Sequence, residues 1–207
     1  EYSKGWGFSV DYQGSANAAV AVQVNVINNA VASGVDAICI SSVDATGLDS
    51  ALTEAKEAGV TVVTWDSDVS DTARTLMVSQ GTPDLLGKML VDMGADSLTN
   101  RGKDTKNDTI KYCWHYSQAT VADQNSWQVA GEAYIKENFP NWENVAPDNY
   151  YSEQDAEKAV SIGASILEAH SDIDLIICND STALPGQCKA AQNKGLTKED
   201  VTITGFA

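Results

Sequence analysis

Residues 34–65, GVDAICISSVDATGLDSALTEAKEAGVTVVTW, contain the pattern that decides the fold. Short apolar runs at Val35–Ser41 and Val60–Trp65 are typical of buried strands. Between them, Leu48–Ala58 has the spacing of an amphipathic helix, and Gly59 stands where a helix C-cap is expected. A strand, a helix and a second strand in this order predict parallel strands joined by a right-handed crossover.

The same alternation continues along the chain. The further predicted strands are Phe8–Val10, Thr75–Ser79, Thr109–Tyr116, Trp142–Ala146, Ile173–Cys178 and Val201–Gly205. The further predicted helices are Asn17–Ser33, Thr82–Leu98, Asn125–Asn138, Ser152–His170 and Ala183–Lys194. Strands that alternate with helices form parallel sheets. We therefore expect an α/β fold with two Rossmann-like lobes, each built on a parallel sheet.

Two helix starts have signals of their own. Thr82 followed by Pro83 is typical of an N-cap with proline at the first helical position. Ser152 and Asp155 have the S-x-x-D spacing of a capping box, so we expect Ser152 to begin the next helix.

A polar stretch, Thr99–Asp108 (TNRGKDTKND), is the predicted boundary between the lobes, which gives lobes 1–104 and 105–207. Glu1–Lys4, followed by Gly5, is typical of the last turn of a helix, and the chain stops on a predicted strand. We therefore expect both lobes to be truncated. The first lacks its first strand and helix, and the second lacks its C-terminal continuation.

The charge balance argues against two classes of partner. The chain has 13 Lys and Arg residues against 29 Asp and Glu residues, a formal net charge of -16. Such a surface repels phosphate backbones and anionic membranes, so no nucleic acid is expected as a partner. The sequence also has no apolar window of the ~18 residues that a membrane-spanning helix needs.

Catalytic and metal-binding motifs are missing as well. The chain has two histidines, His115 within a predicted strand and His170 at a helix end, and no G-x-S-x-G, Walker or G-x-G-x-x-G motif. Residues 66–71 (DSDVSD) resemble the opening of a calcium loop, but Asp71 and Met77 stand where glycine and glutamate are required. We expect no catalytic residue, no metal and no cofactor.

Four cysteines, Cys39, Cys113, Cys178 and Cys188, show no C-x-x-C spacing. The first three lie in apolar runs that are predicted as buried strands, so we interpret them as small buried apolar residues.

The predicted loops beyond the carboxyl ends of the strands are rich in Asp, Ser, Thr, Asn and Gln, and these loops are where open parallel sheets bind ligands. They are Asp11–Gly14, Ser42–Thr46, Trp65–Asp71, Ser117–Gln124 and Asn179–Ala183. Such side chains suit a small polyhydroxylated ligand. Taken singly, Asp66 is equally compatible with organising a turn, and Asp123 and Asn179 with capping helices.

Several motifs together resemble those of the Lsr-type autoinducer-2 receptors. They are TWDSD at 64–68, QGTP at 80–83, LGKMLVDM at 86–93, DQN at 123–125 with Trp127, and ALP at 183–185. These receptors are periplasmic-binding-protein type 1 domains, closely similar to ribose and rhamnose binders. The resemblance implies a monomeric, extracytoplasmic solute-binding protein of an ABC importer, either periplasmic or a cell-surface lipoprotein. Its partners would be a transporter permease and a tetrahydroxy-tetrahydrofuran form of autoinducer-2, held between the lobes.

The resemblance also implies which residues bind the ligand. The matching positions are Asp66, the first aspartate of WDSD, and the adjacent pair Asp123 and Gln124. Two further contacts fall at Asn179 and Ser181, where the family usually has proline and alanine. A carboxylate accepts hydrogen bonds from two hydroxyl groups, and a glutamine both donates and accepts.

Other functions remain open at this level. A pentose or rhamnose binder has the same scaffold. The sensor domain of a lactose-repressor-type regulator has it too, although a net charge of -16 opposes DNA binding. An enzyme is the least favoured alternative, because no activated nucleophile or acid–base pair is identifiable.

Overall fold

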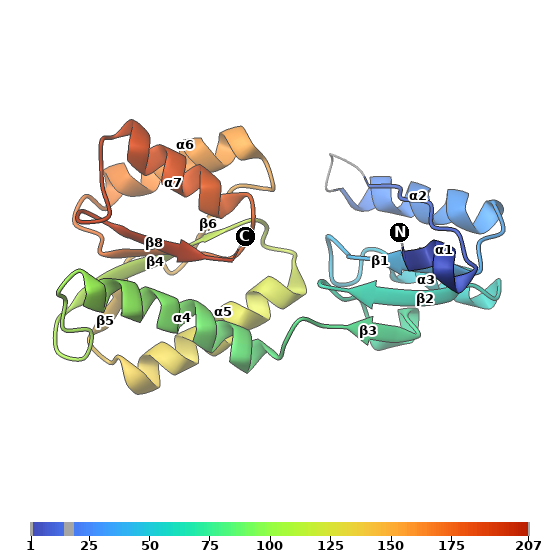
Figure 1. The fold of residues 1–207 in the computed structure, drawn as a ribbon, viewed down its shortest axis with the longest axis horizontal. Helices are drawn as coiled ribbons and strands as arrows, with labels where there is room; N and C mark the ends of the chain where they lie inside the picture. The colour runs from blue at the N-terminus through green and yellow to red at the C-terminus, as the bar shows by residue number, and fades with distance from the viewer. Residues whose placement is uncertain (1, 15–18, 207) are drawn as a thin grey trace. The chain divides into compact units, whose positions relative to one another are not determined.

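The computed structural model describes residues 2–14 and 19–206. The chain forms two compact units, Glu1–Val78 and Ser79–Ala207 (Figure 1). This division differs from the predicted boundary after residue 104. Helix α4 (Pro83–Asn100) belongs to the second unit, because its Leu90 and Leu98 are buried in one core with Ile110 of the next strand. The polar stretch is therefore a turn within that unit, where the Arg101 guanidinium donates to the Asp174 main-chain oxygen at 3.1 Å.

The first unit contains a three-stranded parallel sheet in the order β1-β2-β3. Its strands are β1 (Ala37–Ile40), β2 (Thr61–Trp65) and β3 (Leu76–Val78), and its helices are α1 (Tyr2–Trp6), α2 (Val20–Ala32), α3 (Asp49–Glu57) and the short 3-10 helix η1 (Asp71–Ala73). Ile27 of α2 and Leu52 of α3 are buried with Ile38 and Val62 of the strands, so both helices pack against the same core.

Three predictions for the first unit need correction. Phe8–Val10 is not a strand, because it pairs with no described strand and its two apolar side chains are exposed. Helix α1 continues through Gly5 to Trp6, and Gly7 has the positive φ, 78°, that ends it. Cys39 is exposed, because strand side chains alternate and its neighbour Ile38 faces the core. The predicted start of the next helix, Asn17, lies outside the described residues.

The second unit is a five-stranded parallel sheet with helices on both faces. The strands β5-β4-β7-β8 are neighbours in that order, and β6 pairs with the carboxyl end of β4. The strands are β4 (Ile110–Tyr116), β5 (Trp142–Asn144), β6 (Tyr150–Tyr151), β7 (Leu175–Cys178) and β8 (Thr202–Gly205), and the helices after α4 are α5 (Ala122–Asn138), α6 (Ala156–Ala169) and α7 (Ala183–Asn193). Helices α4 and α5 cover one face and α6 and α7 the other (Figure 1). The predicted α/β fold with parallel sheets is confirmed.

Alternation along β4 explains the two cores of this unit. Trp114 and Tyr116 point into the core below α4 and α5, whereas Cys113 packs with Cys178 below α6 and α7. Burial raises the pKa of the Cys113 thiol to about 12, as expected for a cysteine that acts as an apolar residue. Cys188 is half-buried.

The helix starts agree in part with the sequence signals. Thr82 caps α4 by accepting a hydrogen bond from the Leu85 N–H, with Pro83 at the first helical position, as predicted. Helix α6 begins later than predicted, because Asp155 is its N-cap and accepts from the Lys158 N–H at 2.8 Å. Ser152 is instead buried and donates to the Tyr116 main-chain oxygen at 3.1 Å. Among the described residues, no helix is long and apolar enough to span a membrane.

Candidate binding site

In the first unit, Asp66 directly follows the carboxyl end of β2 and is half-buried. Its φ of 59° lies in the left-handed region, which non-glycine residues rarely adopt. Its N–H donates to the Val78 main-chain oxygen at 3.2 Å, and the Ser41 hydroxyl donates to its Oδ2 at 3.4 Å. An unusual backbone conformation next to a strand end is a frequent property of ligand sites.

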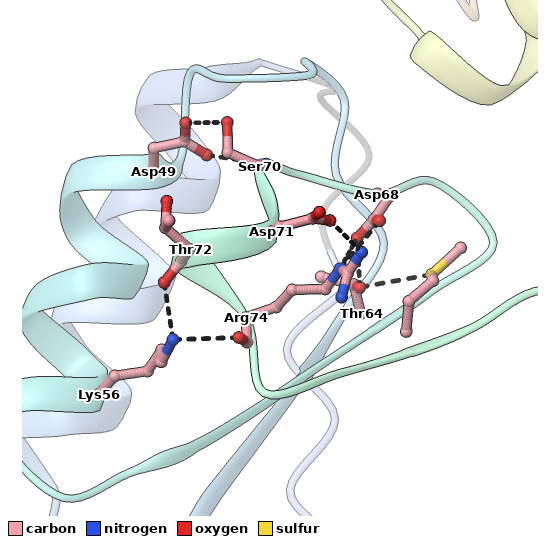
Figure 2. A network of polar contacts seen from close by, with 9 residues as sticks. Asp49, Lys56, Thr64, Asp68, Ser70, Asp71, Thr72 and Arg74 are labelled. Atoms are coloured by element: carbon pink, nitrogen blue, oxygen red, sulfur yellow. Dashed lines mark hydrogen bonds and ion pairs between the residues drawn. The ribbon is translucent and has the colours of Figure 1, made fainter.

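Asp68, two residues further on, has a different role (Figure 2). Its carboxylate accepts from the Arg74 Nε at 2.8 and 2.9 Å and from the Thr64 hydroxyl at 2.5 Å. Arg74 also donates to Asp71 at 2.6 Å. These contacts close the loop that follows Asp66. Two of the three carboxylates in the segment that resembles a calcium loop, those of Asp68 and Asp71, are therefore paired with Arg74 of the protein itself.

In the second unit, Asp123 and Gln124 lie in the first turn of α5. The helix starts at Ala122, three residues earlier than predicted, and Val121 occupies its N-cap position. Asp123 is thus not the N-cap residue. The Tyr116 hydroxyl donates to the Gln124 main-chain oxygen at 2.8 Å, which ties this turn to the end of β4. The Gln124 side-chain oxygen is buried and has no hydrogen-bond partner in the protein.

The polar residues of the segment after β7, residues 179–181, have different environments and different roles. Thr182 is the N-cap residue of α7, and Asp180, not Asn179, stabilises this helix start, since its Oδ1 accepts from the N–H groups of Thr182 and Ala183, both at 2.6 Å. Asn179 is 2% exposed, and its side-chain amide lies near the Tyr116 hydroxyl, although neither amide atom forms a hydrogen bond of good geometry. Ser181 is exposed, so its side chain does not share this buried position.

Further buried polar atoms without partners lie near the carboxyl ends of β4, β7 and β8. With Gln124 and Asn179, they come from His115, Ser117, Asp180 and Thr204. Because almost all buried polar groups in proteins are hydrogen-bonded, such a concentration indicates a place where a polar ligand or water supplies the partners. Sequence reasoning included Ser117 and Asp180 in its loops but missed His115 and Thr204, since both lie within apolar strands.

A cavity of about 480 Å³ lies away from this edge, against Tyr112 and Trp142 near the amino end of β4. Its carboxylate, Glu132, already accepts from the Tyr112 hydroxyl, the Trp114 indole and the Asn144 amide at 2.7 to 2.9 Å. This arrangement is a filled hydrogen-bond network. Among the described residues, no group of three His, Cys, Asp or Glu side chains is placed to hold a metal ion.

Parallel α/β units whose polar side chains gather beyond the carboxyl ends of the strands are typical of proteins that hold a small polar ligand. The chain belongs to the periplasmic binding protein domain family, whose sequence profile matches residues 1–207.

Solved structures place it more closely within that family. The chain is 71% identical to LsrB from Clostridium saccharobutylicum, solved in complex with AI-2, over 100% of this chain and 63% of that chain, with a TM-score of 0.98. It is 25% identical to an ABC transporter solute-binding protein from Clostridium phytofermentas with bound L-rhamnose, over 91% of this chain and 56% of that chain (TM-score 0.81). A solute-binding protein from Agrobacterium vitis with bound D-fucose is also 25% identical, over 99% and 68% of the two chains (TM-score 0.83). The chain thus spans 63% of the LsrB chain, and the predicted resemblance to Lsr-type receptors is confirmed.

Proposed function

We propose that this chain is the ligand-capturing part of an extracytoplasmic solute-binding protein of an ABC importer, and that its ligand is autoinducer-2 or a closely similar small polyhydroxylated molecule. The observation that carries the proposal is the group of buried polar atoms beyond the carboxyl ends of β4, β7 and β8 that have no hydrogen-bond partner within the protein, among them the Gln124 side-chain oxygen. Leaving such a group unpaired is costly unless a ligand or water completes it. The 71% identity to an LsrB in complex with AI-2 supports the choice of ligand.

The proposed contacts suit a molecule with several hydroxyl groups. The carboxylates of Asp66 and Asp123 accept hydrogen bonds from ligand hydroxyls, and the amides of Gln124 and Asn179 both donate and accept. Ser181 contributes through its main chain, in keeping with its exposed side chain.

In this proposal the protein acts as a monomer that delivers its ligand to a transporter permease, either in the periplasm or as a lipoprotein on a cell surface. It catalyses no reaction, because the proposed site contains acceptors and donors for hydroxyl groups but no activated nucleophile.

A pentose or a rhamnose-type sugar is the second candidate. The observation that favours it is the pair Asn179 and Ser181, which stand where the Lsr-type receptors usually have proline and alanine. Each substitution adds a polar side chain, and a further donor or acceptor changes which hydroxyl pattern is recognised.

Calorimetric titration of the purified protein with autoinducer-2, L-rhamnose, D-fucose, D-ribose and D-arabinose tests both candidates. We expect saturable binding of autoinducer-2 at least about tenfold tighter than any sugar, equivalent to about 1.4 kcal/mol. Tighter binding of one of the sugars would favour the second candidate. Absence of heat with all five ligands contradicts the proposed function.

A further inference from the structure

Gln23, on α2, holds the loop that follows β1 with both ends of its side-chain amide. Its Nε2 donates to the Ser41 main-chain oxygen at 2.7 Å, and its Oε1 accepts from the Val43 N–H at 3.1 Å. The amide orientation is therefore fixed, because a carbonyl oxygen only accepts and an N–H only donates. Gln23 lies one helical turn before Ile27, which is 1% exposed and anchors α2 in the core. The loop is thus attached to a rigid element.

The same loop contacts the segment of Asp66. The Ser41 hydroxyl donates to Asp66 Oδ2 at 3.4 Å, and the Ser42 N–H donates to the Ser67 main-chain oxygen at 3.1 Å. Ser42 is 3% exposed, so its main-chain bond is shielded from water. The loop after β1 therefore links α2 on one side to Asp66 and Ser67 on the other.

Asp66 needs such support because of its backbone conformation. With a φ of 59°, Asp66 has a left-handed backbone conformation, which an L-residue keeps only when its surroundings hold it. A carboxylate that captures a hydroxyl group must also be kept in one orientation before the ligand arrives, since ordering it on binding lowers affinity.

We propose that Gln23 is a positioning residue for ligand capture, acting through Ser41 and Ser42 to orient the Asp66 carboxylate without touching the ligand. The inference rests on the proposed function of Asp66 in binding a polyhydroxylated ligand. It gives a role in binding to a helical residue that lies outside every motif of the sequence.

The test compares two substitutions of Gln23 with a matched control. Gln23→Met keeps the length of the side chain and removes both hydrogen bonds. Gln23→Glu keeps the acceptor for Val43 and places a carboxylate against the Ser41 carbonyl. Gln192→Met makes the same chemical change at an exposed position of α7. For each variant, affinity for autoinducer-2 is measured by calorimetry, the unfolding midpoint by urea titration, and exchange of the Val43 amide hydrogen by mass spectrometry or NMR.

We expect Gln23→Met to weaken autoinducer-2 binding about 5- to 30-fold, the effect of losing one or two orienting hydrogen bonds. Exchange at Val43 should accelerate in Gln23→Met and much less in Gln23→Glu, which should still bind more weakly than wild type. Gln192→Met should bind as wild type does. If Gln23→Met proves unstable, Ser41→Ala removes only the hydroxyl contact with Asp66 and should weaken binding by a smaller factor.

The outcomes separate the two proposals. Wild-type affinity in Gln23→Met with faster exchange at Val43 overturns the positioning role and leaves the proposed function intact. If the wild-type protein binds a sugar instead of autoinducer-2, the same variants are compared with that sugar. If the wild-type protein binds none of the ligands, both proposals fall.

Discussion

The Nε of Arg74 lies 2.8 Å from Oδ1 and 2.9 Å from Oδ2 of Asp68, and both side chains are 21% exposed. Because of this half-buried ion pair, the two aspartates of the WDSD motif have different roles. Asp68 is committed to the loop (Figure 2), whereas Asp66 is held at the strand end by the main chain of Val78 and the hydroxyl of Ser41. The motif thus combines a carboxylate that shapes the loop with one that we propose binds the ligand.

Replacement of Asp66 should act on binding. We expect Asp66→Ala to weaken ligand affinity roughly 10- to 100-fold, because a charge-assisted hydrogen bond contributes about 1.5–3 kcal/mol. Asp66→Asn is the control for the backbone, since asparagine also tolerates a positive φ. It should retain the stability of wild type and still lose most of the affinity in a calorimetric titration. Wild-type affinity in both folded variants would remove Asp66 from the site.

Replacement of Asp68 should act on stability instead. Asp68→Asn removes the carboxylate that accepts from the Arg74 Nε and leaves Arg74 only the exposed carboxylate of Asp71, so it should lower the free energy of unfolding by about 1–3 kcal/mol. Urea denaturation gives this change, and ligand affinity of the folded variant should stay within about threefold of wild type. An Asp68→Asn variant that is as stable as wild type but binds tenfold more weakly would reverse the roles of the two aspartates.

Asn179→Leu should change stability and binding in opposite directions. Removing a buried amide that forms no hydrogen bond of good geometry and has the Tyr116 hydroxyl nearby should leave the ligand-free protein as stable as wild type, or more stable by up to about 2 kcal/mol, while ligand affinity falls. Gln187→Met is the matched control, because both ends of that buried amide are hydrogen-bonded, its oxygen to His115 at 2.9 Å and its nitrogen to the Gly163 oxygen at 3.3 Å. The control should be destabilised. Strong destabilisation of Asn179→Leu would mean that the amide has a structural partner.

His115 should make stability depend on pH. Burial lowers its pKa from 6.5, although its contact with Gln187 and the charge of Asp180 act in the opposite direction. The unfolded chain therefore binds a proton as the pH falls through 6.5, while the folded chain stays neutral to a lower pH. Stability contributed by neutral His115 is complete above that pH and is lost as the pH falls below it.

The measurement is the urea midpoint between about pH 7.5 and about pH 5.5, where most carboxylates remain ionised. Wild type should lose stability over this range. His115→Asn keeps an N–H donor near Gln187, starts from a lower midpoint and should show a shallower decrease. Equal slopes for the two proteins would exclude His115 as the source of the pH dependence.

Much of the fold follows from local patterns, because apolar side chains recur with the period of the element that buries them. Val60–Trp65 and Thr109–Tyr116 were predicted within one residue of β2 and β4. The start of α5 was missed, because the segment 122–124 has few apolar side chains to indicate a helix. This difference affects the candidate site, because Asp123 and Gln124 were predicted in a loop but lie in the first turn of that helix.

The sequence by itself determined the class of fold and the loops in which Asp66, Gln124 and Asn179 occur, since strand and helix periods and turn residues are local properties. Only the tertiary structure decided which polar side chains are already paired within the protein. The partners come from distant parts of the chain, as Gln187 does for His115 and Gln23 for Ser41. Asp68 is paired by Arg74, whereas Asn179 is enclosed near the Tyr116 hydroxyl without a hydrogen bond of good geometry, although both are polar residues beyond a strand end. Tertiary packing determines which of these side chains is paired, because burial and hydrogen bonding depend on what surrounds a side chain in space and not on its neighbours in sequence.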